Sequence, residues 1–160
     1  MSSRVYRYRH RVTFDETNLV GNVYFAHYAH WQGHCREHFL ADHAPGVLTG
    51  LSTGLALVTV SLSMEFYAEC HALDLVDVEM SLVELSGNRI TMAFDYRRTG
   101  QGATTSELVA SGRQTVAVMS RADGHLRPEP VPADLAAALA PYASPTTHRP
   151  AAARPARAVR

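Results

Sequence analysis

The chain has 160 residues, of which 46% are hydrophobic and 19% charged, with 15 basic and 15 acidic residues and a formal net charge of zero. This composition predicts one soluble globular domain with a core of its own. It excludes a nucleic-acid-binding protein, which would need a basic face across the folded part, and a membrane-spanning helix, which would need about 18 consecutive apolar residues.

The first elements are a strand and a loop. Residues 5–14 alternate between apolar or aromatic and basic side chains, which is the period of a half-buried strand. Residues 15–22 are typical of a loop, with Gly21-Asn22 as its turn.

Residues 23–43 contain no proline and only one glycine, and they predict a long helix. One broad face carries large side chains, namely Tyr24, Tyr28, Trp31, Cys35 and Phe39. A second face carries the small residues Ala26, Ala29 and Gly33. Two packing faces indicate a helix enclosed on more than one side. Ala44-Pro45-Gly46 is expected to end it.

Four more segments alternate with the period of strands: 55–66, 75–85, 89–97 and 107–119. Turns are expected at 86–88, 99–104 and 122–125, after which residues 127–130 leave the sheet. A short helix is expected over 133–140. Residues 144–160 are mostly Ala, Pro and Arg and predict a disordered tail, so the predicted domain is 1–143.

The order strand, loop, long helix and then strands joined mostly by tight turns predicts an α+β fold. In it, a curled antiparallel sheet of five to six strands wraps around one long central helix. Such a sheet leaves open edges, and pairing of an edge strand with a second copy is the natural remedy.

The segment Asp15-Glu16-Thr17-Asn18-Leu19-Val20-Gly21-Asn22-Val23-Tyr24-Phe25-Ala26-His27-Tyr28 resembles hotdog-fold thioesterases of the 4-hydroxybenzoyl-CoA type. Their pattern before the long helix is roughly D-x-D-x-x-G-x-V-x-x-x-x-Y. The resemblance continues at Trp31, Arg36 and Phe39 and again over residues 71–76, and it covers about residues 5–120. It implies a hotdog fold and the hydrolysis of an acyl thioester.

One position departs from this pattern, because the family's catalytic carboxylate falls at Asn18, which is neutral. With G-N-V-Y-F and H-W-Q-G-H-C-R-E, this asparagine is most similar to thioesterases of enediyne polyketide pathways. That resemblance implies antibiotic biosynthesis, in which a β-keto polyene chain is released from the acyl carrier protein of an iterative synthase. Without a carboxylate base, an electrophilic β-keto thioester suits the site better than an ordinary one.

The resemblance implies that the N–H of Phe25, at the positive end of the helix dipole, points at the thioester carbonyl. Asn18 would orient water or the oxyanion, or would only cap the helix. Arg36 would stabilise the forming anion, or would pair with Glu65 or Glu69. The Tyr28 hydroxyl would bind Asn18 or water, or would sit at the edge of the core.

The acyl chain is expected to lie against the aromatic face of the helix and a neighbouring strand. The candidate substrate-binding residues are Tyr24, Leu57, Met64, Glu65 and Phe66. Core packing is the alternative for the apolar members of this set. Glu65 and Glu37 are also rival carboxylates for the chemistry, since other hotdog branches place a glutamate on the central helix.

We expect neither a cofactor nor a metal. His27, His30, His34 and His38 form a stripe whose spacing permits metal binding, but no acidic partners accompany it. The chain starts without the apolar stretch of a signal peptide, so we expect a cytoplasmic protein with Cys35 and Cys70 as free, packed thiols.

The expected partners are an acyl carrier protein domain of a polyketide synthase, the small-molecule acyl thioester, and further copies of the chain in a dimer or a homotetramer. Nucleic acid and membrane are not expected. Basic residues that would meet an acidic carrier protein are Arg4, Arg7, Arg9, Arg11, Arg97 and Arg98. A general acyl-CoA thioesterase and a non-catalytic polyene-binding chaperone of the same fold are the alternative functions.

Overall fold

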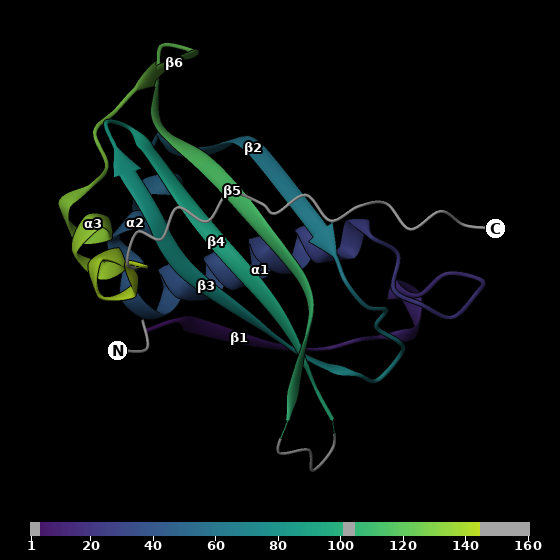
Figure 1. Cartoon of the computed structure of the whole chain (residues 1–160). Helices are drawn as coiled ribbons and strands as arrows, with labels where there is room; N and C mark the ends of the chain where they lie inside the picture. The colour runs from purple at the N-terminus through teal and green to yellow at the C-terminus, as the bar shows by residue number, and fades with distance from the viewer. Residues whose placement is uncertain (1–3, 101–104, 145–160) are drawn as a thin grey trace, which may run out of the picture.

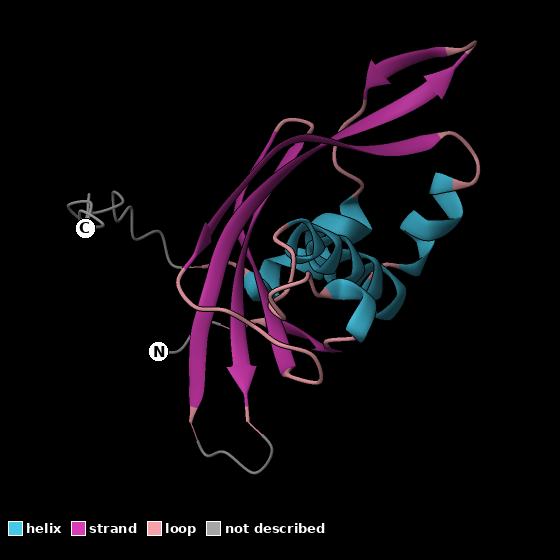
Figure 2. Ribbon diagram, turned by 90° about the vertical axis from the view of Figure 1, so that its right-hand side faces the viewer, coloured by secondary structure: helices cyan, strands magenta, loops and turns pink. Residues whose placement is uncertain are grey.

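The computed structural model describes residues 4–100 and 105–144. Within these residues six strands form one curled antiparallel sheet, and the helices lie on its concave side (Figures 1 and 2). The elements are β1 (Tyr6–Arg11), the 3-10 turn η1 (Phe14–Glu16), α1 (Ala26–His43), α2 (Pro45–Leu51), β2 (Leu55–Phe66), β3 (Leu75–Ser86), β4 (Arg89–Thr99), β5 (Ser106–Ala122), β6 (His125–Pro128), α3 (Ala133–Leu139) and the 3-10 turn η2 (Ala140–Tyr142). This is the expected α+β architecture.

The sheet has the strand order β1-β3-β4-β5-β2, and β6 adds to β5. Every pairing is antiparallel. The expected turns at 86–88 and 99–104 predict the β3–β4 and β4–β5 neighbours, but they do not predict the place of β2. This strand pairs with β5 and not with β3, which follows it in the sequence. Residues 67–74 therefore carry the chain from the β2 edge to β3, beside the opposite edge.

The core lies between α1 and the concave face of the sheet. Four members of the predicted broad face of α1 are at most 3% exposed, namely Tyr28, Trp31, Cys35 and Phe39. Alternate residues of the central strands meet them, namely Val76, Val78, Met80, Ile90, Met92, Phe94, Tyr96, Val116 and Val118. Each large apolar side chain buried here stabilises the fold by about 1.5–3 kcal/mol. The period of two along each strand thus produces the core.

The helix begins at Ala26 and not at residue 23 as predicted. The Val23 N–H donates to the Cys70 carbonyl oxygen at 2.8 Å, and Asn22 forms an isolated bridge with His71. These long-range bonds hold residues 22 and 23 in an extended conformation. Helical periodicity over this stretch could not reveal a partner almost fifty residues away.

The predicted end of the long helix at 44–46 is confirmed, since α1 ends at His43. A short helix that was not predicted follows, and Pro45 occupies its first turn, a position that needs no N–H donor. One further prediction about local structure is wrong. Residues 127 and 128 do not leave the sheet, because Arg127 pairs with Ser120 and Pro128 with Met119. Proline is tolerated there because it is the last residue of a short edge strand.

Ser144, the first residue of the predicted tail, donates its N–H to the Leu82 carbonyl oxygen at 2.8 Å. The rest of that tail, 145–160, lies outside the described residues, as does most of the predicted turn at 99–104. No helix among the described residues combines the length and apolar character needed to cross a bilayer.

Candidate active site

The N-terminal loop, defined here as residues 12–25, is anchored by the carboxylate of Glu16. This side chain is 8% exposed and accepts hydrogen bonds from Trp31 Nε1 at 2.8 Å and from the Thr13 N–H at 2.9 Å. His10 Nε2 lies 2.8 Å from Glu16 Oε2. Burial alone would raise the pKa of Glu16, but these hydrogen bonds outweigh it and lower the pKa to about 2.

Glu16 did not figure among the carboxylates expected at the site. Its signal was the Thr13-x-x-Glu16 spacing of a capping box, which forms here at η1. The Glu16 carbonyl oxygen also accepts from the Tyr24 N–H at 3.0 Å. Glu16 thus fixes both ends of the N-terminal loop against β1 and α1.

The start of α1 offers a free backbone donor. No side chain caps this helix end, and among the described residues the Phe25 N–H donates no hydrogen bond. An uncapped helix start carries a partial positive charge and attracts an anion or a carbonyl oxygen. The geometry at Phe25 therefore suits the oxyanion donor that the resemblance implies.

Asn18 is exposed in the turn that precedes this helix end. Its Oδ1 accepts from the Val20 N–H at 3.0 Å, and its own N–H donates to the Asn22 carbonyl oxygen at 2.9 Å. The asparagine therefore stabilises its own turn, and the alternative that it caps the long helix is wrong. Its amide NH2 makes no hydrogen bond within the described residues, so this donor can face a ligand.

Arg36 lies half-buried farther along α1, and its guanidinium donates to Gln114 Oε1 at 2.8 Å. Burial lowers the pKa of Arg36, while the charge of Glu37 acts in the opposite direction. Glu65 and Glu69, the alternative partners, do not pair with it. Glu65 accepts from the Tyr67 hydroxyl, and Glu69 accepts from the Asn22 amide. No ion pair among the described residues includes Arg36.

The Arg36 side chain borders a small apolar cavity of about 10 Å³, which the surrounding side chains almost close. The cavity is lined by Arg36, Phe39, Leu40, Leu57, Ile90, Met92, Val116, Leu135 and Leu139. Leu57, one of the predicted substrate-binding residues, is part of this lining. A cation with no anionic partner, placed at an otherwise apolar cavity, is costly unless a ligand meets it.

Alternate residues of β2 face opposite sides of the sheet, and this separates the predicted substrate-binding set. Met64 and Phe66 face α1, since Met64 Sδ accepts from Gln32 Nε2 at 2.9 Å and the rings of Phe66 and Tyr28 lie 5.1 Å apart. Glu65 lies on the convex side. Its carboxylate is not brought to the other candidate residues.

The aromatic candidates also divide into two groups. Tyr24 and Phe25 are 48% and 61% exposed at the helix start, with their rings 4.6 Å apart. Tyr28 is buried beside Cys70. Burial and the hydrogen bond with Cys70 raise the pKa of the Tyr28 hydroxyl. Its hydroxyl does not bind Asn18. Within one chain Tyr28 is a residue of the core, as the alternative stated for it.

Asn18 and Arg36 are not brought together within one chain. Arg36 lies about 15 Å along the axis from the first residue of α1, at 1.5 Å rise per residue. The Asn18 side chain bonds to its own turn, whereas the Arg36 side chain bonds to β5. The predicted site therefore consists of an outer part at the helix start and an inner part at the apolar cavity.

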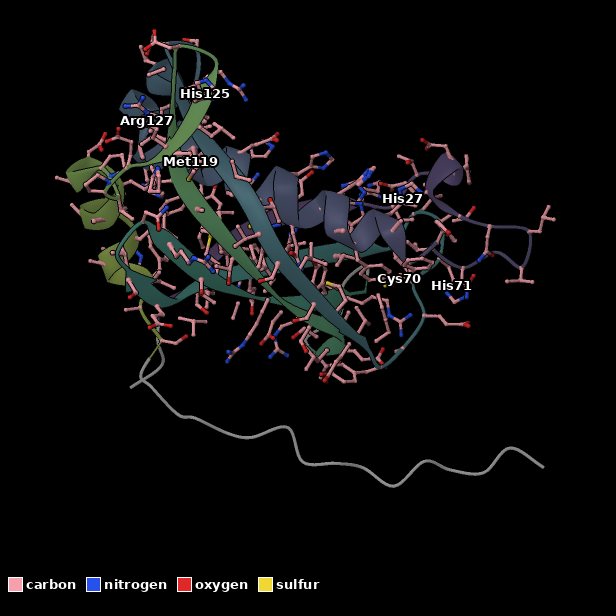
Figure 3. All side chains as sticks on the ribbon, turned by 90° about the horizontal axis from the view of Figure 1, so that it is seen from above. His27, Cys70, His71, Met119, His125 and Arg127 are labelled. Carbon is pink, nitrogen blue, oxygen red and sulfur yellow. The ribbon has the colours of Figure 1, made fainter. Side chains whose placement is uncertain are left out.

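Within residues 4–100 and 105–144, no group of three or more His, Cys, Asp or Glu side chains is arranged to hold a metal ion. At one end of the histidine stripe, His38 stacks on Tyr8 with a ring separation of 4.9 Å. At the other end, His27 lies on the same side of the molecule as Cys70 and His71 (Figure 3).

Both thiols are free and buried. Cys35 Sγ donates to the Val78 carbonyl oxygen at 3.7 Å, and burial raises the pKa of this thiol to about 12. Burial also raises the pKa of Cys70. A thiol in such surroundings is a packing group and a poor nucleophile.

Comparison with known proteins shows which family this chain resembles in sequence and structure. The Thioesterase-like superfamily matches residues 12–139. A solved dynemicin thioesterase, described as showing induced-fit and allosteric effects upon polyene binding, is 61% identical. The similarity covers 89% of this chain and 100% of that chain, with a TM-score of 0.85. Among curated proteins no sequence matches.

Two more distant structures share the fold. The 4-hydroxybenzoyl-CoA thioesterase from a Pseudomonas strain is 20% identical over 84% of this chain and 99% of that chain, with a TM-score of 0.72. A 1,4-dihydroxy-2-naphthoyl-CoA thioesterase from Synechocystis is 18% identical over 86% and 96%, with a TM-score of 0.73. The chain therefore belongs to the Thioesterase-like superfamily and is a thioester hydrolase of the hotdog fold.

Proposed function

We propose that the substrate is a β-keto polyene acyl thioester carried by the acyl carrier protein of an iterative enediyne polyketide synthase. The observation that carries the proposal is Arg36, an unpaired cation at an otherwise apolar cavity. An apolar chain that ends in a polar, developing negative charge complements both features. The 61% identical dynemicin thioesterase, described in connection with polyene binding, supports a polyene chain.

In the proposed reaction water attacks the thioester carbonyl, the C–S bond breaks, and the thiol of the carrier leaves. The Phe25 N–H of one copy and Arg36 of a neighbouring copy stabilise negative charge on the carbonyl oxygen, and the Asn18 amide beside Phe25 orients the water. A well-placed oxyanion donor lowers the barrier by about 3–4 kcal/mol. The keto group at C3 makes the carbonyl more electrophilic, so weak water activation suffices. The released β-keto acid then loses carbon dioxide without further catalysis.

Assembly of further copies, as a dimer or a homotetramer, is part of the proposal. Large apolar side chains are exposed in the N-terminal loop and along the β2 edge, namely Phe14, Leu19, Val20, Phe25, Val60, Leu62 and Phe66. Large exposed apolar side chains gathered in a loop and along a sheet edge favour contact with another copy. A contact between copies would place the outer part of one site beside the inner part of another.

The basic surface expected to meet the carrier protein is largely neutralised within the chain. Arg9 pairs with Asp77 at 2.7 Å, and Arg7 and Arg97 pair with Glu79 at 2.7 Å and 3.1 Å. Arg98 pairs with Glu107. The proposal of a carrier protein therefore rests on the resemblance and the polyene-binding relative, and not on a free basic face.

The test is thiol release from matched carrier-bound and CoA-bound thioesters, each with and without the 3-keto group. The proposal predicts the highest kcat/KM for the carrier-bound β-keto polyene and a decarboxylated ketone as the final product. Equal rates on saturated acyl-CoA would identify a general acyl-CoA thioesterase. Retained polyene absorbance without thiol release would identify a polyene-binding chaperone.

A further inference from the structure

Gln32 is a buried polar residue that the reaction described above does not use. It lies on α1 one turn before Arg36 and is 0% exposed. Its Nε2 donates to the thioether sulfur of Met64, at 2.9 Å, and a thioether is a weak acceptor. Its Oε1 has no hydrogen-bond partner. An amide in this state is costly, since a buried unsatisfied polar atom destabilises a fold by about 1–3 kcal/mol.

The nearest hydroxyl cannot satisfy this oxygen. Tyr96 lies close to Gln32, but its O–H donates to the Tyr28 carbonyl oxygen at 2.7 Å. A hydroxyl has one proton to donate. The Gln32 Oε1 therefore remains free for a group that the chain does not itself supply.

Strand β5 has a glycine, Gly112, at the position that faces this amide. A Cβ atom on Gly112 of β5 would lie 2.5 Å from Gln32 Nε2 and 2.6 Å from Met64 Sδ. Both distances are shorter than real contacts allow, so any other residue here would displace the amide. Glycine leaves the space that Gln32 occupies.

Gln32 and Arg36 form one row against β5. They are one helical turn apart, a rise of about 6 Å, and Gly112 and Gln114 are spaced by about 6.6 Å along the strand. Gln32 lies over Gly112, and Arg36 bonds to Gln114. The matched spacings place an amide and a guanidinium on neighbouring turns of α1, both facing β5.

We propose that the Gln32 amide recognises the oxygen at C3 of the β-keto acyl chain, an inference that rests on the proposed function. Two oxygens separated by one methylene group interrupt the otherwise apolar substrate at its thioester end. With Arg36 at the thioester oxygen, the neighbouring amide meets the second oxygen. Nε2 donates to the ketone, and Oε1 accepts from the hydroxyl of its enol form. A saturated chain offers no hydroxyl to Oε1 and leaves Nε2 with only a weak thioether acceptor in place of the ketone, and the site selects against it for this reason.

The experiment compares two variants that replace a buried glutamine by the unbranched, apolar methionine. Gln32→Met removes the proposed reader of the C3 oxygen, whereas Gln114→Met removes the partner of Arg36. The measured quantity is the ratio of kcat/KM for a carrier-bound β-keto thioester to that for the saturated thioester of the same length. Thermal unfolding of each variant shows that it is folded.

Gln32→Met is expected to lower this ratio by about 10-fold, the loss of one good hydrogen bond. Its melting temperature should equal or exceed that of the parent, because no unsatisfied atom remains. Gln114→Met should slow both substrates together and change the ratio by less than about 2-fold. A ratio unchanged in Gln32→Met, or lowered equally in both variants, would overturn the inference. A parent chain that releases no thiol would instead overturn the proposed function.

Discussion

Glu16 contacts α1 and Arg36 belongs to it, but the two charged side chains differ in the hydrogen bonds that the chain offers them. Glu16 accepts hydrogen bonds from Trp31 and Thr13, lies beside His10, and has its pKa lowered to about 2. Arg36 has one neutral partner and no carboxylate, and burial lowers its pKa. The Glu16 charge, whose hydrogen-bond donors all belong to the chain, stabilises the fold. The half-buried Arg36 charge lacks an anionic partner, so it is available to a ligand, at a cost to the free protein.

The largest effect that follows from this contrast concerns turnover at Arg36. Arg36→Met is expected to lower kcat/KM for the β-keto thioester by about 100-fold, the effect of losing one oxyanion donor. The melting temperature should stay close to that of the parent, since the variant removes a half-buried charge that has no anionic partner but leaves the buried Gln114 Oε1 without its donor. Thiol release and thermal unfolding of the same sample check both points.

The matched control for Arg36 is Arg113→Met. Arg113 precedes Gln114 on β5 but is exposed on the opposite face of the sheet. Its replacement should leave thiol release within about 2-fold of the parent, as is usual for exposed positions. If Arg36→Met lost stability but kept its turnover, Arg36 would stabilise the fold and would not serve the substrate.

Glu16 should behave in the opposite way. Glu16→Gln places an NH2 group against the donors that the carboxylate accepts, so the free energy of unfolding should fall by about 2 kcal/mol. For a chain of this length, that corresponds to a melting temperature lower by about 4–8 °C. Glu37→Gln, on the exposed side of α1, is the control and should change stability by less than about 0.5 kcal/mol.

The pH dependence of stability sharpens this prediction. The folded-state pKa of Glu16 is about 2, below its ordinary value of 4.5. The ionised carboxylate therefore contributes stability that is complete above about pH 4.5 and is lost as pH falls toward 2. The difference in melting temperature between the parent and Glu16→Gln should shrink across this window. A difference that stays constant would show that the carboxylate charge is not what anchors the N-terminal loop.

Asn18 tests the outer part of the site with a smaller expected effect. Asn18→Ala should lower kcat for the β-keto thioester by about 10-fold, because water would lose one orienting group. Stability and the oligomeric state should change little, since the residue is exposed. Asp15→Ala, which removes another exposed polar group of the same loop, should leave kcat unchanged. Equal kcat in Asn18→Ala and the parent would remove Asn18 from the mechanism.

The smallest effect is expected at the thiols. Cys35→Ala should keep kcat within about 2-fold of the parent, because burial raises the pKa of this thiol to about 12 and prevents thiolate formation. Stability should fall by about 1 kcal/mol through loss of packing. Loss of all turnover in a folded variant would show that the thiol takes part in the reaction.

The sequence predicted those features of the fold that depend on local periodicity. The bounds of β2 match the prediction, and the broad face of α1 is the face that packs on the sheet. The place of β2 beside β5 and the start of α1 at Ala26 depend on partners far along the chain. No local pattern contains that information.

The candidate site was predictable in composition but not in arrangement. The family pattern singled out Asn18, Phe25 and Arg36, yet it could not show that Arg36 lacks an acidic partner. Met64 can line the site and Glu65 cannot, because the two residues lie on opposite faces of the sheet. Which face each occupies follows from the register with β5. The unsatisfied amide of Gln32 has no sequence signature, because satisfaction depends on what surrounds a side chain.

The most direct test is to measure melting temperatures of the parent chain and Arg36→Met with and without a non-hydrolysable β-keto thioester analogue. Free Arg36→Met is expected to melt close to the parent. The analogue, at about 100 times its parent Kd, is expected to stabilise the parent by about 2.7 kcal/mol and the variant far less. Equal stabilisation of both proteins would contradict the claim that the Arg36 charge is held for the substrate.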